Sequence, residues 1–267
     1  MRWFKTGLPL VFLWLLLAVS VAYAGPTSEI TVSSALSLKG PFDEIGKAME
    51  KRGVRAIFNF GASGMLQKQI EGGAPVDVFA AASLKEMDEL LKKGLIKENM
   101  KSDFAGNSIV LVSSLKSGIR VKSFSDLKKG EIKRIAIGNP ATVPAGKYSE
   151  EVLRHSGVWD AIKEKLVFAE NVKQVMDYVV REEVEAGMLF LTDAMARKKD
   201  LTILIEAPQD SHKKVVYTIA AISGTKNEKA AREFISLVMS EEGKGILQRY
   251  GFRLLKQTTH VRKKGGV

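Results

Sequence analysis

The chain has 267 residues, of which 45% are hydrophobic and 27% charged, so it is long enough for one large domain or for two lobes of roughly 100 residues. It contains no Cys, which excludes disulfides, thiol chemistry and lipid attachment through a cysteine. The formal net charge of +11 invites a nucleic-acid interpretation, but basic residues alternate with acidic ones along the chain. We predict a globular protein that does not bind nucleic acid.

The first 24 residues have the pattern of a secretory signal peptide. Arg2 and Lys5 precede an uncharged, leucine-rich run over residues 7–24, and Ala22–Ala24 forms an Ala-x-Ala site. We predict cleavage after Ala24 and export to the periplasm. An uncleaved membrane anchor is the alternative, because the run is nearly long enough to span a bilayer.

Strand and helix patterns alternate after this leader. The predicted strands are residues 29–34, 54–60 and 77–81, and the predicted helices are residues 42–52, 65–71 and 84–93. Ser83 and Glu86 have the spacing of a capping box at the start of the third helix. This alternation predicts a parallel, doubly wound α/β sheet.

A second alternating set follows, and then a C-terminal pair of helices. The expected strands are residues 108–112, 134–137, 165–168, 186–191, 201–205 and 215–222, and the expected helices are residues 149–155, 172–182, 192–197, 228–239 and 241–250. Thr225 and Glu228 again have capping-box spacing.

The predicted fold is therefore α/β, with two doubly wound lobes. We assign residues 25–106 to lobe 1, residues 107–208 to lobe 2, residues 209–256 to the completion of lobe 1, and residues 257–267 to a basic disordered tail. The chain then crosses between lobes twice, near residues 105–107 and 208–212. Two crossings form a hinge with a cleft that can close on a ligand.

Catalytic motifs are missing from the sequence. The three histidines, His155, His212 and His260, lie far apart without metal-ligand spacing. Met65 follows Gly61–Gly64, so no nucleophile elbow is formed, and Tyr148 stands where a phosphate-binding loop needs Ser or Thr. We predict no catalytic residue, no metal ligand and no cofactor, and an enzyme acting on a small phosphorylated substrate stays as the alternative.

Small residues recur instead where strands turn into helices. Ser37, Ser63 and Ala145 occupy such turns, and Val172 begins a helix. These loops gather at the carboxyl ends of the strands, where backbone N–H groups at helix starts favour anions. The alternative role for the two serines is helix N-capping.

Several segments resemble the periplasmic molybdate-binding proteins of molybdate ABC transporters. The resemblance runs in order over residues 29–252, and the segments that carry it are residues 30–38, 61–64, 72–79, 106–108, 143–148, 210–214 and 249–252. It implies the type II periplasmic binding protein fold, with a tetrahedral oxyanion held between the lobes. It also implies a membrane permease as partner and a monomeric receptor, with molybdate or tungstate as transported ligand.

Carried over by position, the resemblance places five residues at the anion. Ser37 and Ser63 would donate through hydroxyl and backbone N–H, and Ala145 and Val172 through backbone N–H. The fifth family ligand is a Tyr hydroxyl, but this chain has Phe190 there. A hydrogen bond to a charged group contributes about 1.5–3 kcal/mol, so an uncompensated loss would weaken binding roughly 10- to 150-fold.

What replaces that hydroxyl is left open by the sequence: Thr192, a water molecule or a further N–H could do so. Phe190 and Val172 could also be simple core residues. We expect an exported receptor for molybdate or tungstate. A receptor for another tetrahedral oxyanion such as sulfate is the alternative.

Overall fold

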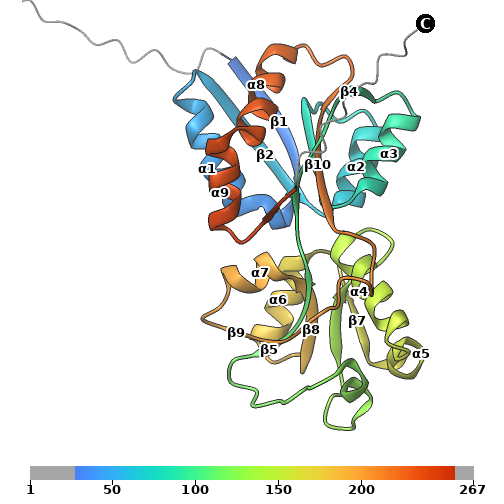
Figure 1. The fold of residues 1–267 in the computed structure, drawn as a ribbon. Helices are drawn as coiled ribbons and strands as arrows, with labels where there is room; N and C mark the ends of the chain where they lie inside the picture. The colour runs from blue at the N-terminus through green and yellow to red at the C-terminus, as the bar shows by residue number, and fades with distance from the viewer. Residues whose placement is uncertain (1–27, 256–267) are drawn as a thin grey trace, which may run out of the picture.

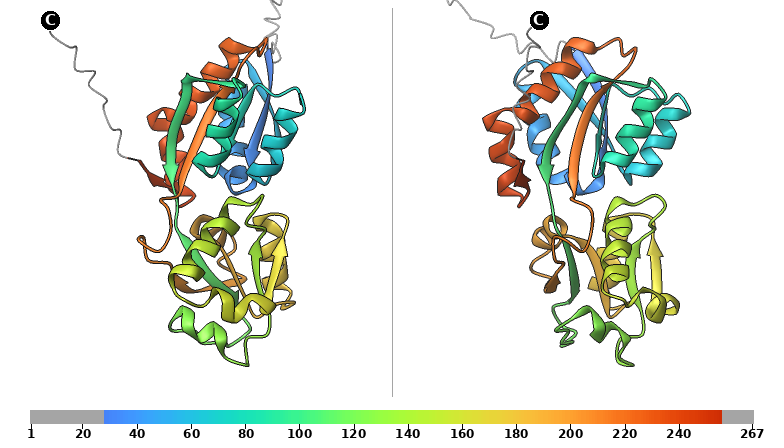
Figure 2. Two further views of the ribbon diagram at one scale, coloured as in Figure 1. Left: turned by 90° about the vertical axis from the view of Figure 1, so that its right-hand side faces the viewer. Right: turned by 45° about the vertical axis from the view of Figure 1, so that its right-hand side comes forward.

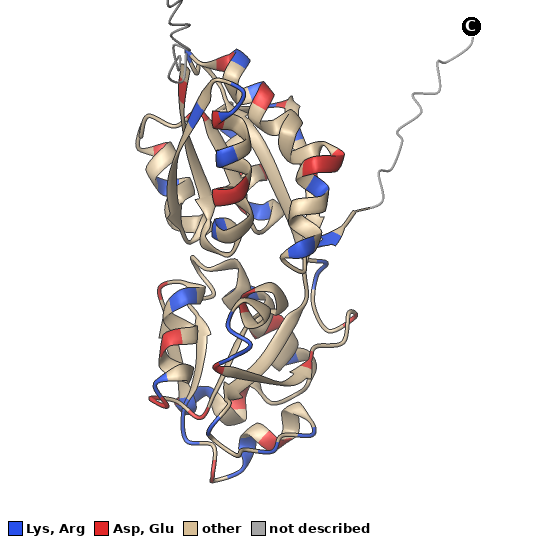
Figure 3. Ribbon diagram, turned by 90° about the vertical axis from the view of Figure 1, so that its left-hand side faces the viewer, with Lys and Arg blue, Asp and Glu red and all other residues tan. Residues whose placement is uncertain are grey.

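The computed structural model describes residues 28–255, which form two lobes stacked end to end (Figure 1). The predicted signal peptide and the predicted basic tail beyond Lys256 lie outside these described residues. Between residues 28 and 255, no helix has the length and apolar character needed to cross a membrane. Basic and acidic residues are interspersed along the ribbon of both lobes (Figure 3).

Lobe 1 is built on a six-stranded sheet in the order β11-β4-β10-β3-β1-β2. β1 pairs in parallel with β2 and β3, whereas β10 runs antiparallel to β3 and β4. The bounds are Ser28–Ala35 for β1, Val54–Gly61 for β2, Val78–Ala81 for β3, Ile96–Gly106 for β4, Val216–Ile222 for β10 and Arg253–Leu254 for β11.

Helices from both ends of the chain cover this sheet. The helices α1, α8 and α9 lie on one face and α2 and α3 on the other (Figure 1). Their bounds are Lys39–Glu50 for α1, Ser63–Glu71 for α2, Leu84–Lys92 for α3, Glu228–Met239 for α8 and Glu241–Arg249 for α9. Phe42 of α1 meets Phe234 of α8 edge to face at 5.5 Å between ring centroids, so the C-terminal helices complete the core of lobe 1.

Lobe 2 has a five-stranded sheet in the order β7-β6-β8-β5-β9. The strands are Ile109–Ser114 (β5), Ile135–Gly138 (β6), Leu166–Ala169 (β7), Ala186–Phe190 (β8) and Leu201–Glu206 (β9), and the α-helices are Pro144–His155 (α4), Trp159–Ile162 (α5), Val172–Val180 (α6) and Leu191–Ala196 (α7). Within residues 28–255, short 3₁₀ helices are Leu36–Leu38 (η1) in lobe 1 and Phe124–Lys128 (η2) and Lys163–Lys165 (η3) in lobe 2.

The chain passes between the lobes from β4 to β5 and again from β9 to β10 (Figure 2). The predicted α/β fold of two lobes with a two-crossing hinge is therefore confirmed. The prediction of wholly parallel sheets is wrong. β5 and β10 each start at the hinge, where their neighbours β8 and β3 end, so they pair antiparallel with them.

Two strands and two caps also differ from expectation. Nothing in the sequence indicated β4, because its first half carries exposed polar residues instead of alternating apolar ones. Neither capping box forms: the Ser83 hydroxyl bonds the Glu86 carboxylate, and the Thr225 hydroxyl bonds Asp77. β11 has only two residues, too few for a periodic signal.

The aromatic contact between the two chain ends makes a testable stability prediction. Phe42→Ala should lower the free energy of unfolding by about 3–5 kcal/mol, because Phe42 is fully buried and also packs near Phe58 and Phe104. Urea unfolding measures the change. Phe168→Ala is the matched control, since Phe168 is 51% exposed, and equal losses for both variants would contradict the assigned core.

Candidate functional site

The strand-to-helix loops of both lobes meet around one small cavity between them. All five residues predicted from the sequence line it, together with Ala35, Leu36, Gly61, Ala62, Ala82, Val143, Pro144 and Asn171. The predicted five are Ser37, Ser63, Ala145, Val172 and Phe190. Its free volume is about 20 Å³, enough for about one water molecule. The structure thus brings the five together with the lobes closed over them, and their contact with an anion stays a prediction.

The two serines use their side chains in another way than helix capping. Ser63 is the first residue of α2, and its hydroxyl oxygen accepts the backbone N–H of Ala82 at 3.1 Å. Ser37 lies within η1, and its Oγ is 2.9 Å from the hydroxyl of Tyr217. No side chain caps η1 or α2, so the capping alternative is wrong. Because Ser63 Oγ already accepts a hydrogen bond, its own hydrogen is free for the cavity.

Ala145 and Val172 stand at helix starts in lobe 2. Pro144, which has no N–H, is the first residue of α4, so Ala145 carries the first backbone donor of that helix. Val172 opens α6 directly after Asn171, whose side-chain oxygen accepts the N–H of Gln174 at 3.0 Å. The Asn171 oxygen is thereby occupied, so what its side chain still offers is its N–H₂ group, a donor.

The start of α4 is packed directly onto the end of β6. A methyl group on Gly146 would lie 1.9 Å from the carbonyl oxygen of Gly138, and one on Gly138 would lie 2.5 Å from a methyl of Val143. Only glycine fits at both positions without moving the backbone. These two glycines bring the first N–H groups of α4 to the cavity.

Phe190 ends β8 and is 1% exposed. Its ring lies 5.7 Å from that of Tyr217 and 6.4 Å from that of Tyr148, so it is part of an aromatic cluster behind the cavity. It brings no hydroxyl to the site. The buried carboxyl of Asp193 follows three residues later, in α7.

Comparison with known proteins fits this arrangement. Residues 30–253 match the model of the family described as bacterial extracellular solute-binding protein. The chain belongs to this family. The sequence is 34% identical over 248 residues to the molybdate-binding protein ModA of Escherichia coli, covering 89% of this chain and 95% of that one. It is 38% identical over 225 residues, 84% of this chain and 85% of the other, to a Bacillus subtilis protein named as an ABC transporter substrate-binding lipoprotein, YvgL.

A solved structure shares the fold of this solute-binding protein. The periplasmic molybdate-binding protein of Azotobacter vinelandii superposes with a TM-score of 0.76 at 23% identity, over 85% of this chain and all of that one. The resemblance first drawn from the motifs is thus confirmed.

Charged side chains are absent from the cavity lining of this solute-binding protein. Partial positive charge comes instead from the N-termini of α2, α4 and α6, whose first residues lie there. Within residues 28–255, no three His, Cys, Asp or Glu side chains are grouped to hold a metal ion. The site is suited to an anion held by neutral donors.

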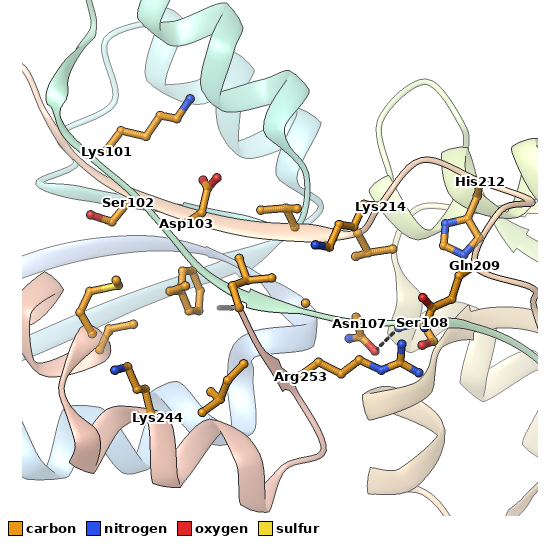
Figure 4. A pocket seen from close by; sticks show the side chains of 18 residues that line it. Lys101, Ser102, Asp103, Asn107, Ser108, Gln209, His212, Lys214, Lys244 and Arg253 are labelled. Atoms are coloured by element: carbon orange, nitrogen blue, oxygen red, sulfur yellow. Dashed lines mark hydrogen bonds between the residues drawn. The ribbon is translucent and has the colours of Figure 1, made fainter. Parts of the chain in front are cut away.

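A larger hollow of about 1120 Å³ lies along the hinge and includes none of the five predicted residues (Figure 4). Its basic side chains are largely neutralised by carboxylates. Lys101 pairs with Asp88 at 3.0 Å, Lys244 with Glu241 at 2.7 Å and Arg253 with Glu206 at 2.8 Å. The small cavity is therefore the better candidate for the predicted anion site.

No role in the site was predicted for Tyr217, Asn107 or Asn171. Tyr217 lies in the largely apolar run of residues 215–222, which predicts only a buried strand. Asn171 carried a signal that could have been used, because Asn immediately before a helix is a typical N-cap. The hydrogen bond from the Gly64 N–H to the Thr142 carbonyl oxygen joins residues 78 positions apart and has no local signature.

Asp193 predicts a pH dependence of stability. Burial raises its pKa to about 7, so between about pH 4 and 7 the folded protein holds a proton that the unfolded chain has released. The free energy of unfolding should therefore fall as pH rises through this window, by up to about 1.4 kcal/mol per pH unit from this group. Asp193→Asn should remove that contribution.

Urea unfolding of the wild type and of Asp193→Asn at pH 5 and pH 8 measures this pH dependence of the free energy of unfolding. The variant should gain stability relative to wild type at the higher pH. Asp160→Asn, at an exposed position of α5, is the control. Identical pH dependence in the wild type and Asp193→Asn would contradict the assignment.

Proposed function

We propose that this protein captures molybdate or tungstate between its lobes in the periplasm and delivers it to the membrane permease of an ABC importer. The observation that carries the proposal is the small uncharged cavity lined from both lobes by Ser37, Ser63, Ala145, Val172 and Phe190. Relatives with 30% or more identity that are named as molybdate-binding proteins support the choice of ligand.

The polarity of the lining supports a fully deprotonated oxyanion. The Ser63 oxygen and the Asn171 oxygen already accept backbone N–H groups, so both side chains offer hydrogen-bond donors to the cavity. A protonated phosphate also needs an acceptor for its P–OH group, and each of these two oxygens already uses one lone pair for a backbone N–H. Molybdate, tungstate and sulfate need donors only, and the size of the opened cavity would select among them.

Burial of a dianion must be offset by these donors, since unpaired buried charge is costly. Each helix N-terminus contributes about 0.3–1 kcal/mol, and up to about 2 kcal/mol where it is partly buried. Three such termini meet here. The arrangement needs no titratable group and offers none for acid–base chemistry, so we propose a monomeric receptor without enzymatic turnover.

Calorimetric titration of the ligand-stripped protein, from Gly25 onward, tests the proposal. We expect submicromolar binding of molybdate and tungstate, with sulfate and phosphate weaker by about a hundredfold or more. Stronger binding of sulfate would overturn the choice of ligand and keep the receptor. Absence of heat with all four anions would refute the receptor, and turnover of small phosphorylated compounds would then be assayed.

Closure of the lobes involves a direct backbone contact. The N–H of Gly64 at the start of α2 donates to the carbonyl oxygen of Thr142 in lobe 2 at 3.1 Å. A methyl group on Gly64 would lie 2.8 Å from that oxygen and 3.0 Å from the Thr142 Cα. Both near atoms belong to the other lobe, so the methyl group would oppose closure and leave lobe 1 itself unstrained.

Gly64→Ala should therefore weaken molybdate binding by roughly 5- to 150-fold, because overpacking costs about 1–3 kcal/mol. Its stability without ligand should stay near that of the wild type. Titration calorimetry and urea unfolding measure the two effects. Gly245→Ala in α9 is the control, since its methyl group would meet only the end of Arg249 at 3.9 Å; wild-type affinity in Gly64→Ala would exclude the contact from closure.

A further inference from the structure

Tyr217 lies behind the cavity and holds one of the predicted anion-binding serines. It belongs to β10, is fully buried, and does not line the cavity. Its hydroxyl oxygen is 2.9 Å from Ser37 Oγ and 3.2 Å from Asn107 Nδ2. The ring packs against Phe190 at 5.7 Å and Phe252 at 5.1 Å, so the hydroxyl has a fixed place.

The direction of hydrogen bonding at Asn107 follows from its neighbour. Asn107 stands at the crossing from β4 to β5, and its Oδ1 accepts the backbone N–H of Ser108 at 2.9 Å (Figure 4). A backbone N–H cannot accept, so the oxygen must face it and the amide nitrogen must face the other way. The two hydrogens of Nδ2 are then donated to Tyr217 Oη and, at 2.8 Å, to Thr192 Oγ1.

The direction of hydrogen bonding at the Tyr217 hydroxyl follows in the same way. Its oxygen accepts from Asn107, which cannot accept in return, and within residues 28–255 Ser37 Oγ is the other hydrogen-bond partner of this hydroxyl. A buried phenolic hydrogen without a partner is unfavourable, so Tyr217 donates to Ser37. The Ser37 oxygen is thereby occupied, and its own hydrogen is left to donate into the cavity.

We propose that Asn107 and Tyr217 are positioning residues that fix the Ser37 hydroxyl as a donor to the bound oxyanion; this rests on the proposed function. Donation along a chain also strengthens the last donor, because each hydrogen bond polarises the next. A stronger Ser37 donor offsets part of the loss caused by Phe190. Ser63 is arranged in a similar way, because its hydroxyl oxygen accepts the backbone N–H of Ala82 and its own hydrogen can be donated into the cavity.

This chain of hydrogen bonds also spans the hinge between the lobes. Ser37 and Tyr217 belong to lobe 1, Thr192 to lobe 2, and Asn107 to the connection between them. One amide group therefore bonds both lobes when the cleft is closed. The Asn107 amide nitrogen therefore links the Ser37–Tyr217 pair of lobe 1 to Thr192 of lobe 2.

A double-mutant cycle with Tyr217→Phe and Ser37→Ala tests the positioning role. Tyr217→Phe should weaken molybdate binding by about three- to tenfold in the wild-type background, because the oriented and polarised donor is lost. In the Ser37→Ala background the same change should alter affinity less than about twofold. Tyr178→Phe is the matched control, because its hydroxyl accepts from Gln174 at 2.9 Å within α6.

Asn107→Asp tests the direction of the hydrogen bonds from Asn107 through Tyr217 to Ser37, because Asp has the same shape as Asn. A carboxylate oxygen in place of Nδ2 would accept the Tyr217 hydrogen, so Ser37 would lose its donor. Affinity should fall further than in Tyr217→Phe. The fraction of this loss that persists in the Tyr217→Phe background measures the added negative charge alone.

Titration calorimetry with molybdate and ligand-free urea unfolding are run on every variant. Equal weakening by Tyr217→Phe with and without Ser37, or a loss of stability with unchanged affinity, would overturn the positioning role. If the wild type binds no oxyanion, the proposed function fails and the positioning role fails with it. The double-mutant coupling energy between Tyr217→Phe and Ser37→Ala, measured from ligand-free urea unfolding, would then still test the hydrogen bond between these two residues.

Discussion

The feature on which the proposed function depends is a cavity between the lobes that has no charged side chain in its lining. Any stabilisation of an anion must therefore come from oriented hydrogen-bond donors. A side-chain oxygen that accepts a hydrogen bond from behind leaves the hydrogens of that side chain to point into the cavity. The Ala82 N–H is accepted by Ser63 and the Gln174 N–H by Asn171, and we propose that Tyr217 donates to Ser37 in the same way.

This requirement explains features of the fold that otherwise look unrelated. Gly138 and Gly146 allow α4 to start against the end of β6, which brings its first N–H groups to the cavity. Gly64 lets lobe 1 touch the backbone of lobe 2 at Thr142. In each case a missing side chain lets backbone groups approach closely, and the backbone supplies the donors.

The sequence allowed prediction of what depends on local pattern or on motifs. Strand-to-helix alternation indicated the two lobes, and the positions of Ser37, Ser63, Ala145, Val172 and Phe190 followed from the family resemblance. The side-chain network could not be predicted, because Asn107, Thr192 and Tyr217 are brought together only by the hinge and by β10 returning from lobe 2. β4 was not predicted, because its exposed first half lacks alternating apolar residues. The two predicted capping boxes do not form, because the hydroxyls of Ser83 and Thr225 bond carboxylates instead of backbone N–H groups.

The insertion of lobe 2 into lobe 1 has a consequence for the order of folding. β5 to β9 come from one continuous stretch, whereas β10 sits between β3 and β4 and Phe234 of α8 packs on Phe42 of α1. Lobe 2 therefore makes its contacts between residues closer in sequence and can complete its core early. The core of lobe 1 can be completed only after β10 and α8 have been synthesised. During synthesis, the half of the candidate site that lobe 2 supplies can therefore form before the sheet of lobe 1 is complete.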